Sequence, residues 1–270
     1  MTSRAFALPV ALLTTLGIAL GTSACLADAT ALPGSTSGRT GTSMGSVSTP
    51  VGSAPVGSAP AAGRPGSAVA TLRTLAVKGR APKTGYARSQ FGQAWTDAVS
   101  VEGGHNGCDT RNDILRRDLS SATTKPSTHG CVVLSGSLRD PYSGRILAFR
   151  RGGSTSSLVQ IDHVVALSDA WQTGAGAWPA ARRTTFANDP LNLLAVQGSL
   201  NSAKGDGDAA TWLMPNTAFR CPYVARQVAV KARYGLWLTP AERDAMSRVL
   251  AGCPAQPLPT AAQTDVPPPR

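Results

Sequence analysis

Apolar residues change their spacing several times along the chain, and these changes predict short strands that alternate with helices. Short apolar runs bounded by turn residues predict strands at 131–134, 145–149, 160–165 and 191–196. Helical spacing predicts helices at 112–119, 166–178, 182–188, 209–213 and 222–234. Residues 91–99 fit a strand and a short helix equally well. The mixture indicates an α+β domain.

The best start signal for a helix lies near the C-terminal end of this pattern. Thr239 can cap a first turn, and Pro240 then occupies the first helical position. Glu242 stands where a capping box requires an acidic or amide side chain. We expect a last helix that begins at Pro240 and ends before Gly252.

The first 29 residues have the layout of a secretory signal peptide. Arg4 is followed by an apolar run from Phe6 to Leu20 and then by small residues. The alternative, a permanent membrane anchor, requires about 20 apolar residues, which is more than this run supplies. Two processing sites compete. Ala27-Asp28-Ala29 fits a cleavage site, whereas Thr22-Ser23-Ala24-Cys25 resembles a lipoprotein box that would lipidate Cys25, with Thr22 in place of the usual Leu.

The rest of the chain divides by composition into a linker, a domain and a tail. Residues 30–66 are almost entirely Gly, Ser, Thr, Ala, Pro and Val, and they contain the pentapeptide VGSAP twice in succession. Such a segment lacks the apolar mass to offset the entropy of ordering. We expect one folded domain over 68–254 and a disordered, proline-rich tail over 255–270.

Beyond Cys25 the chain has an even set of cysteines, namely Cys108, Cys131, Cys221 and Cys253. Four cysteines in an exported protein predict two disulfides, for which three connectivities are possible. We favour the local pairs Cys108–Cys131 and Cys221–Cys253, because each closes a loop around one predicted helix. Bonds of this kind stabilise a fold by typically about 2–4 kcal/mol.

The folded part of the chain is basic. The chain has 26 Lys and Arg against 15 Asp and Glu, a formal charge of +11. Residues 1–66 account for +2 of this, which leaves +9 for the remainder. A basic domain attracts polyanions such as nucleic acid, and also an anionic cell wall or lipid surface.

Candidate chemistry gathers around Asp162 and His163, which stand side by side at the end of a predicted strand. Phosphodiester hydrolysis needs an activated water, and a bound divalent metal can stabilise the charge at phosphorus and the leaving oxygen. Mg²⁺ prefers oxygen ligands and needs only one or two from the protein. Asp162 and Asn201 offer such oxygens, and His163 has the ordinary pKa range of a general base. Lys204 can hold a phosphate.

Three separated blocks of sequence carry a resemblance to a known family. They are Cys108–Leu115, Asp162–Trp171 and Asn188–Val196, the last with Asn201–Asp206 following it. In this order they resemble the HNH (His-Me finger, ββα-metal) endonucleases. Within that superfamily they are most similar to secreted actinobacterial-type proteins, which share a nuclease domain with the C-terminal part of GmrSD-type modification-dependent restriction enzymes. The resemblance runs from about Gly107 to Trp212, and more loosely to Cys253.

The resemblance implies a ββα-metal core with additional helices, and one role for each matching residue. Asp162 would bind the metal, and His163 would be the general base. Asn192 would fix the loop that carries the base through backbone hydrogen bonds. Asn201 matches a metal-binding position that is His in the name-giving motif, and Lys204 would contact the phosphate.

Residues outside these five positions have weaker implied roles. Arg111 is a second candidate phosphate contact, with a structural ion pair to Asp109 as the alternative. Asp208 and Trp212 match the family as structural support for the final helix. The chain has no phosphate-cradling Walker loop, so the modification sensing of the restriction enzymes is not expected.

The resulting expectation is an exported, metal-dependent endonuclease of low sequence specificity, acting on DNA and also on RNA as a candidate substrate. It would use one divalent metal, Mg²⁺ before Mn²⁺ or another ion, and act as a monomer. Membrane contact would come only through an N-terminal lipid or an uncleaved signal. The alternative function is a non-catalytic basic module that binds nucleic acid or the cell wall. A wall-active hydrolase is disfavoured, because no paired carboxylates or His/Cys metal cluster are evident.

Several candidate residues also have purely structural interpretations. Asn201 could cap a helix, Asn192 could cap a turn, and Lys204 could be a solvated charge. Asp206 and Asp208 lack the spacing of an EF-hand. We expect His105 and His129 on the surface, and four tryptophans in the core: Trp171, Trp178, Trp212 and Trp237.

Overall fold

The computed structural model describes residues 66–153 and 155–262. The expected signal segment over 1–29, with Cys25, lies outside these residues, as does the expected linker up to residue 65. None of the helices within the described ranges is long and apolar enough to cross a membrane.

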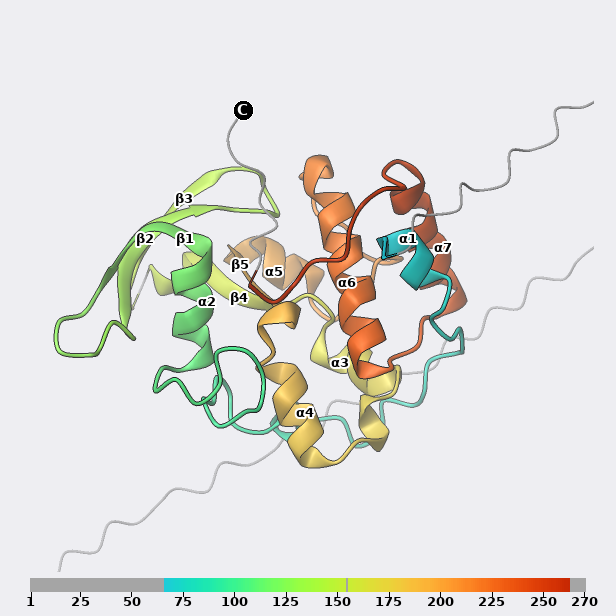
Figure 1. Ribbon diagram of the computed structural model, residues 1–270, viewed down its shortest axis with the longest axis horizontal. Helices are drawn as coiled ribbons and strands as arrows, with labels where there is room; N and C mark the ends of the chain where they lie inside the picture. The colour runs from blue at the N-terminus through green and yellow to red at the C-terminus, as the bar shows by residue number, and fades with distance from the viewer. Residues whose placement is uncertain (1–65, 154, 263–270) are drawn as a thin grey trace, which may run out of the picture. The chain divides into compact units, whose positions relative to one another are not determined.

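The described residues form a mixed α+β domain built from short elements (Figure 1). The helices are α1 (Ala68–Leu72), α2 (Thr110–Asp118), α3 (Leu167–Gln172), α4 (Ala180–Ala187), α5 (Gly198–Lys204), α6 (Arg220–Tyr234) and α7 (Pro240–Ala251). The strands are β1 (Leu119–Thr124), β2 (Val133–Arg139), β3 (Ile146–Arg150), β4 (Val159–His163) and β5 (Leu193–Gln197). Single 3₁₀ turns connect several of them.

The strands form two antiparallel sheets. The sheet β1-β2-β3 lies at one end of the domain, where the β1–β2 turn extends away from the helices (Figure 1). The β2–β3 turn instead packs into the domain, and Tyr142 in this turn is buried against Tyr223 of α6. β4 pairs with β5 so that Asp162 is opposite Leu194 and His163 is opposite Leu193. α5 follows β5 directly and packs against both strands. β4, β5 and α5 therefore form the expected ββα unit.

The three-stranded sheet is larger than the sequence predicts. β2 continues to Arg139, well beyond the predicted end at residue 134, while β3 matches its prediction. β1 was not predicted at all. Its sequence is LSSATT, and Leu119 is its one buried residue, so no apolar alternation marks it as a strand. β1 is a strand because it pairs with β2, and no apolar pattern of its own accounts for it.

The C-terminal end of α2 is joined to the β5 region by two half-buried charged side chains. Arg117 donates to the carbonyl oxygens of Pro190 at 2.8 Å and Leu193 at 2.6 Å. Asp118 pairs with Arg117 and accepts from the Ala195 amide at 2.8 Å. These bonds satisfy backbone groups next to the ββα unit that burial would otherwise leave unpaired.

Both disulfides form the predicted local pairs. Cys108 is bonded to Cys131 and Cys221 to Cys253, with Cα–Cα distances of 5.0 Å and 6.4 Å. The first joins the start of α2 to the segment that leads into β2, and the second joins α6 to the end of α7.

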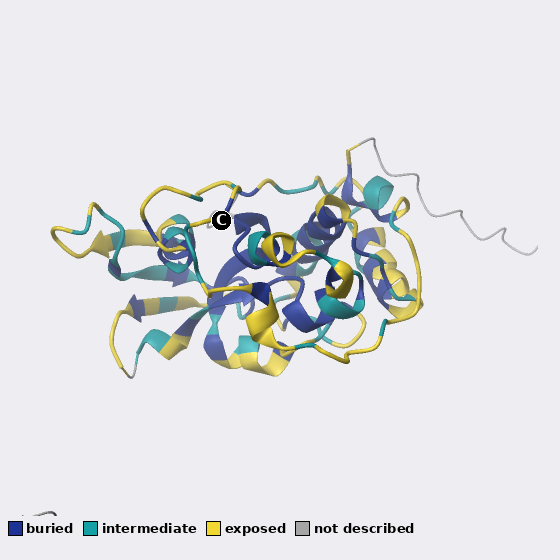
Figure 2. Ribbon diagram, turned by 90° about the horizontal axis from the view of Figure 1, so that it is seen from below, coloured by how far each residue is buried: buried dark blue, intermediate teal, exposed yellow. Residues whose placement is uncertain are grey.

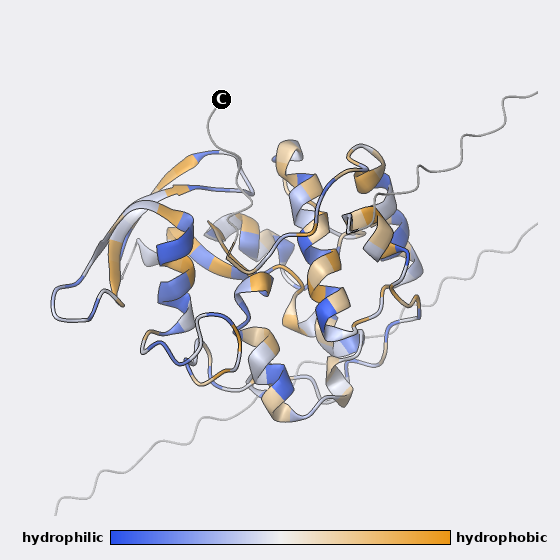
Figure 3. Ribbon diagram, in the orientation of Figure 1, coloured by the Kyte–Doolittle hydropathy of each residue, from blue (hydrophilic) through white to orange (hydrophobic). Residues whose placement is uncertain are grey.

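α6 is the central helix of the domain. Buried residues gather among the helices, whereas the strand ends and the connecting loops are largely exposed (Figure 2). α6 nevertheless carries hydrophilic as well as hydrophobic positions (Figure 3). Among its buried residues are Arg226, Gln227 and Lys231, which are at most 1% exposed. Buried polar groups require partners. Arg226 and Gln227 donate to the carbonyl oxygens of Leu191 and Val164, and Lys231 pairs with Asp169 of α3.

α7 begins as the sequence predicts. The Thr239 hydroxyl accepts from the Glu242 amide at 3.1 Å, and the Glu242 carboxylate accepts from the Thr239 amide at 3.4 Å. Pro240 occupies the first helical position, which completes the predicted start.

Three other predictions of secondary structure are wrong. The helix expected over 166–178 ends after Gln172, because Gly174 adopts a φ of 137° that a helix does not permit. Residues 209–213 form a turn, since the Asp208 carboxylate accepts from the amides of Ala210 and Thr211 and competes with helical bonding. Residues 91–99 are neither strand nor α-helix, but a 3₁₀ end followed by turns.

Residues 255–262, which the composition assigns to the tail, contact the domain. Pro257 forms an isolated bridge with Ser67. Ala261 is buried, and its carbonyl oxygen accepts from Arg117 at 3.0 Å. The described part of this segment therefore helps to cover the ends of α1 and α2.

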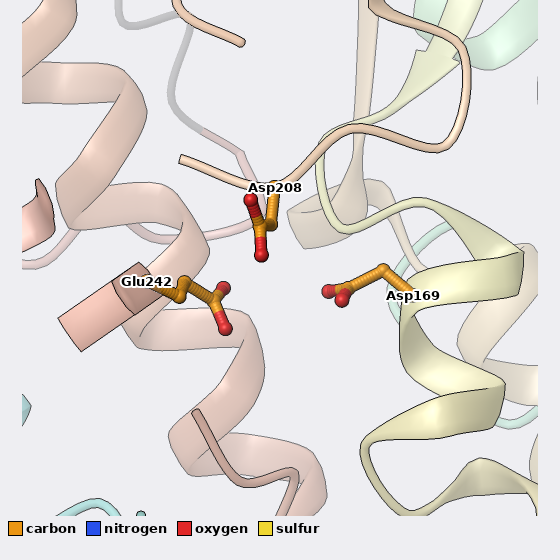
Figure 4. A group of neighbouring side chains, drawn as sticks. All are labelled: Asp169, Asp208 and Glu242. Atoms are coloured by element: carbon orange, nitrogen blue, oxygen red, sulfur yellow. The ribbon is translucent and has the colours of Figure 1, made fainter. Parts of the chain in front are cut away.

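Three buried carboxylates on different elements point toward one another (Figure 4). Two cations hold this network together. Lys231 of α6 pairs with Asp169 of α3 at 3.1 Å and with Glu242 of α7 at 2.8 Å. Arg80 pairs with Asp169 at 2.9 Å and with Asp208 at 2.7 Å. The network thus joins α3, α6 and α7 and the loop at Asp208.

The balance of charge in this network affects Glu242. Two cations face three carboxylates, so one negative charge is left over. Burial, with the nearby Asp169 charge as a smaller cause, outweighs the attraction of Lys231 and raises the pKa of Glu242 to about 7. A carboxyl group that titrates near neutral pH makes the stability of the fold depend on pH.

We predict that Glu242→Gln flattens the pH dependence of stability. The folded-state pKa of Glu242 lies above its ordinary value of 4.5. The folded state therefore binds the proton more tightly, and this contribution to the free energy of unfolding is full below about pH 4.5 and is lost as pH rises through about 7. Urea unfolding of wild type across this range should show that loss, and Glu242→Gln should not. Glu102→Gln, at an exposed glutamate, is the control, and an unchanged slope in Glu242→Gln would contradict the assignment.

Candidate functional site

The ββα unit brings three predicted site residues to one pocket. Asp162 and His163 are the last residues of β4, and Asn201 lies on α5. All three line an open pocket of about 230 Å³, together with Arg88 and Asp206. The pocket therefore combines a histidine with carboxylate and amide oxygens.

His163 is buried and held in one tautomer. Its Nε2 lies 2.9 Å from the carbonyl oxygen of Ala187. A carbonyl only accepts, so Nε2 carries the hydrogen and Nδ1 holds the lone pair. The Trp95 ring lies nearly parallel to the imidazole, with an interplanar angle of 16° and centroids 5.8 Å apart.

The environment of His163 keeps the imidazole neutral. Its side chain is among the buried polar groups, at 7% exposure for the residue. Burial is the main cause that lowers its pKa to about 3, and the positive charges of Arg88 and Lys204 lower it further. Near neutral pH the ring is therefore able to accept a proton at Nδ1.

Asn192 clamps the backbone that follows His163. Its Oδ1 accepts from the Val165 amide at 2.8 Å, and its Nδ2 donates to the Val165 carbonyl at 3.3 Å. Its own carbonyl accepts from the Val164 amide at 2.8 Å. The contact expected from the sequence, an asparagine bonded to the backbone of the loop next to the histidine, is therefore present.

The Asp162 carboxylate is buried and has two donors. Tyr142 donates its hydroxyl to one oxygen, and Lys204 approaches the other at 3.0 Å. Lys204 also donates to the His163 carbonyl at 2.9 Å, and its side chain has no exposed surface. The ammonium is turned into the protein, beneath the pocket. This arrangement is neither the solvated charge nor the phosphate contact considered from the sequence, because the buried carboxylate requires a partner.

Asn201 is the fourth residue of α5, so it does not cap a helix. Its Nδ2 donates to Gln160 at 2.9 Å, which leaves Oδ1 as the group that can accept. The pocket thus offers oxygens from Asp162, Asn201 and Asp206, although Asp206 is exposed and also pairs with Lys83 at 2.9 Å. These ligand types fit a hard divalent cation such as Mg²⁺. A carboxylate oxygen has more than one lone pair, so Asp162 retains acceptor capacity beside its two donors.

Arg111 is not placed in the pocket. Its guanidinium donates to the carbonyl oxygen of Val159 at 3.3 Å and is partly buried. Burial, and then the nearby charge of Arg151, lower its pKa. Asp109 does not pair with it but caps α2, accepting from the Asn112 amide at 2.8 Å. The Asp109 carboxylate is used for capping, because the first amides of a helix have no partner within the helix.

The remaining residues weighed from the sequence have structural surroundings. His105 and His129 are exposed, as expected. Trp171, Trp178 and Trp212 pack against the hydrophobic core. Trp237, also expected in the core, is only half-buried and donates to the Gly79 carbonyl at 3.0 Å. The cluster of Asp169, Asp208 and Glu242 already contains Lys231 and Arg80, so its charge is balanced largely by the protein itself.

Comparison with known proteins agrees with this geometry. The family model described as the C-terminal domain of GmrSD restriction endonucleases matches residues 109–249, just over half of the chain. The chain belongs to this HNH-type family. A GmrSD C-terminal domain indicates a nuclease-type function. No solved structure gives a significant match.

A curated relative extends the similarity beyond the GmrSD C-terminal domain. It is an uncharacterized secreted protein of Arthroderma benhamiae, 36% identical over 189 residues. The alignment covers 69% of this chain and 85% of the relative.

Sequence reasoning missed the part of the site that precedes the GmrSD C-terminal domain. Tyr86 and Arg88 line the pocket, and Trp95 covers one face of the His163 ring. Trp95 has a left-handed backbone, with a φ of 60°, and its carbonyl accepts from the Thr110 amide. No periodic pattern marks this segment. The one available hint was an aromatic residue, Trp95, in the segment 91–99, whose sequence favours neither a strand nor a helix.

We predict that Asn192→Ala destabilises the domain by about 1–3 kcal/mol, because the buried Val165 amide loses its acceptor. Asn188→Ala is a matched control. Asn188 is equally buried, but its Oδ1 has no hydrogen-bond partner among the described residues, and only the bond from Nδ2 to Thr184 is lost. Urea unfolding measures both changes. A loss for Asn192→Ala no larger than for Asn188→Ala would contradict the clamp.

Proposed function

We propose that the protein is an exported, metal-dependent endonuclease that hydrolyses the phosphodiester bonds of DNA with low sequence specificity. The observation that carries this proposal is the setting of His163, whose Nδ1 is free of a proton while Nε2–H is held by Ala187. This base lies in the same pocket as Asp162 and Asn201. The family match supports nuclease-type chemistry.

In the proposed reaction His163 Nδ1 takes a proton from a water whose oxygen attacks the phosphorus. As this bond forms, the bond between phosphorus and the leaving oxygen breaks, and the leaving oxygen takes a proton from solvent. Asp162 and Asn201 would hold one divalent metal, Mg²⁺ in our proposal, which would supply positive charge to stabilise the phosphate and the leaving oxygen. Asn192 fixes the turn after His163, and the Ala187 carbonyl accepts the Nε2 hydrogen, so the ring keeps its orientation as Nδ1 gains a proton. Trp95 keeps water from one face of the ring.

Charge and cysteine chemistry support the substrate and the compartment. The excess of 26 basic over 15 acidic residues favours a polyanion such as DNA, with RNA as the second substrate to assay. Two disulfides and a relative that is named as secreted support export, since disulfides persist in oxidising compartments. Mass spectrometry of the mature N-terminus distinguishes cleavage after Ala29 from lipidation of Cys25.

One observation favours a second candidate function, a non-catalytic nucleic-acid-binding module. Lys204 already neutralises Asp162, and a positive charge there opposes the binding of a metal cation. Such a module would retain DNA in the presence of a chelator and would not cut it.

We predict that His163→Ala lowers plasmid cleavage by about 10²–10⁴-fold, the usual contribution of a general base. Cleavage by wild type should require Mg²⁺ or Mn²⁺ and stop with EDTA. His105→Ala, at an exposed histidine outside the pocket, is the matched control and should cut like wild type. Equal rates of nicking for wild type and His163→Ala would overturn the base assignment, and cleavage that persists in EDTA would overturn the metal.

A further inference from the structure

The cations near the pocket differ in their availability. Lys204 has no exposed side-chain surface and is bonded to Asp162 and the His163 carbonyl. Lys83 pairs with Asp206 at 2.9 Å. Arg88 is exposed, and no hydrogen bond or ion pair to its side chain is found among the described residues. Of the described residues that line the pocket, Arg88 is the one that carries a positive charge.

Arg88 lines two neighbouring cavities that both border His163. It lines the pocket that contains Asp162, His163 and Asn201. It also lines a smaller cavity on the side of His163 that Trp95 and Ala187 border. A guanidinium in this position can reach a phosphate that enters the pocket beside His163.

The backbone that carries Arg88 is anchored although its side chain is exposed. Arg88 begins a 3₁₀ turn that ends at Phe91, which is 2% exposed and packs with Tyr86 and Trp171. Arg183 of α4 donates to the Gln90 carbonyl at 2.8 Å. The side chain therefore extends from a fixed point, which lowers the entropy lost when it binds a ligand.

We propose that Arg88 is the cation that binds the scissile phosphate, in the place that the sequence assigned to Lys204. Its guanidinium donates to the non-bridging oxygens of the phosphodiester and stabilises the charge that develops there. Arg88 lies outside the family match, which begins at residue 109, so the N-terminal segment completes the site. This contact recognises the phosphodiester backbone of the nucleic acid and not its nucleobases. This inference rests on the proposed nuclease function.

The test compares Arg88→Ala and Arg88→Lys with Arg248→Ala, a control at an exposed arginine of α7. Each is assayed on plasmid DNA and on bis(p-nitrophenyl) phosphate, a diester with a single phosphate. A charge-assisted contact predicts a loss of about 10- to 100-fold in kcat/KM for Arg88→Ala on both substrates. Arg88→Lys should recover part of it, because an ammonium lacks the paired donors. Arg248→Ala should match wild type.

Other outcomes overturn the proposal. A loss on plasmid alone that disappears at high salt would make Arg88 part of the general positive field, because such attraction is screened. An unchanged kcat/KM of Arg88→Ala on both substrates would show that Arg88 does not bind the scissile phosphate. Thermal unfolding of each variant verifies that the fold is intact.

A binding measurement separates this inference from the proposed function. Calorimetry with thymidine 3′,5′-bisphosphate reports phosphate binding without catalysis. If wild type cuts neither substrate, the nuclease proposal fails, but Arg88→Ala must still weaken this binding about 10-fold or more. Equal binding by wild type and Arg88→Ala overturns the role of Arg88 whatever the activity.

Discussion

The fold around the site depends on one constraint: the backbone that follows β4 is buried, and each of its polar groups requires a partner. The His163 carbonyl accepts a hydrogen bond from Lys204, and the Val164 carbonyl accepts one from Gln227 of α6 at 3.2 Å. The Val165 amide donates to Asn192 Oδ1, and the Val165 carbonyl accepts from Asn192 Nδ2. Side chains from α5, α6 and the turn before β5 thus converge on three consecutive residues, and they fix the direction of the His163 side chain.

The same burial determines the electrostatics of the site. Removal of His163 from water favours its neutral form, which is the form that accepts a proton. Asp162 is also removed from water, and its buried carboxylate requires hydrogen-bond donors close by. Tyr142 and Lys204 supply these donors from β2–β3 and α5. A neutral imidazole and a buried, hydrogen-bonded carboxylate can therefore stand next to each other in the sequence.

The sequence predicted the features that local chemistry determines. The capping box at Thr239, both disulfides and the placement of Asp162-His163 at a strand end all depend on neighbouring residues or short loops. Asn192 was found through the family pattern. Features that depend on distant contacts were missed. β1 owes its form to β2, and Arg88 reaches the site by the packing of Phe91 against α3 and α4, far along the chain.

The inward position of Lys204 bears most directly on the metal. The Lys204 ammonium, 3.0 Å from Asp162, compensates the charge of that carboxylate. A divalent cation can bind Asp162 beside Lys204, since the carboxylate has spare lone pairs, but the two positive charges weaken each other. The oxygens of Asn201 and Asp206 then add the attraction for the cation that Asp162 alone cannot supply. Lys83 holds Asp206 across an exposed and easily broken ion pair. In the proposed metal site, Asp206 is thus the carboxylate that can turn from its lysine toward a cation at small cost, whereas Asp162 is held by two donors.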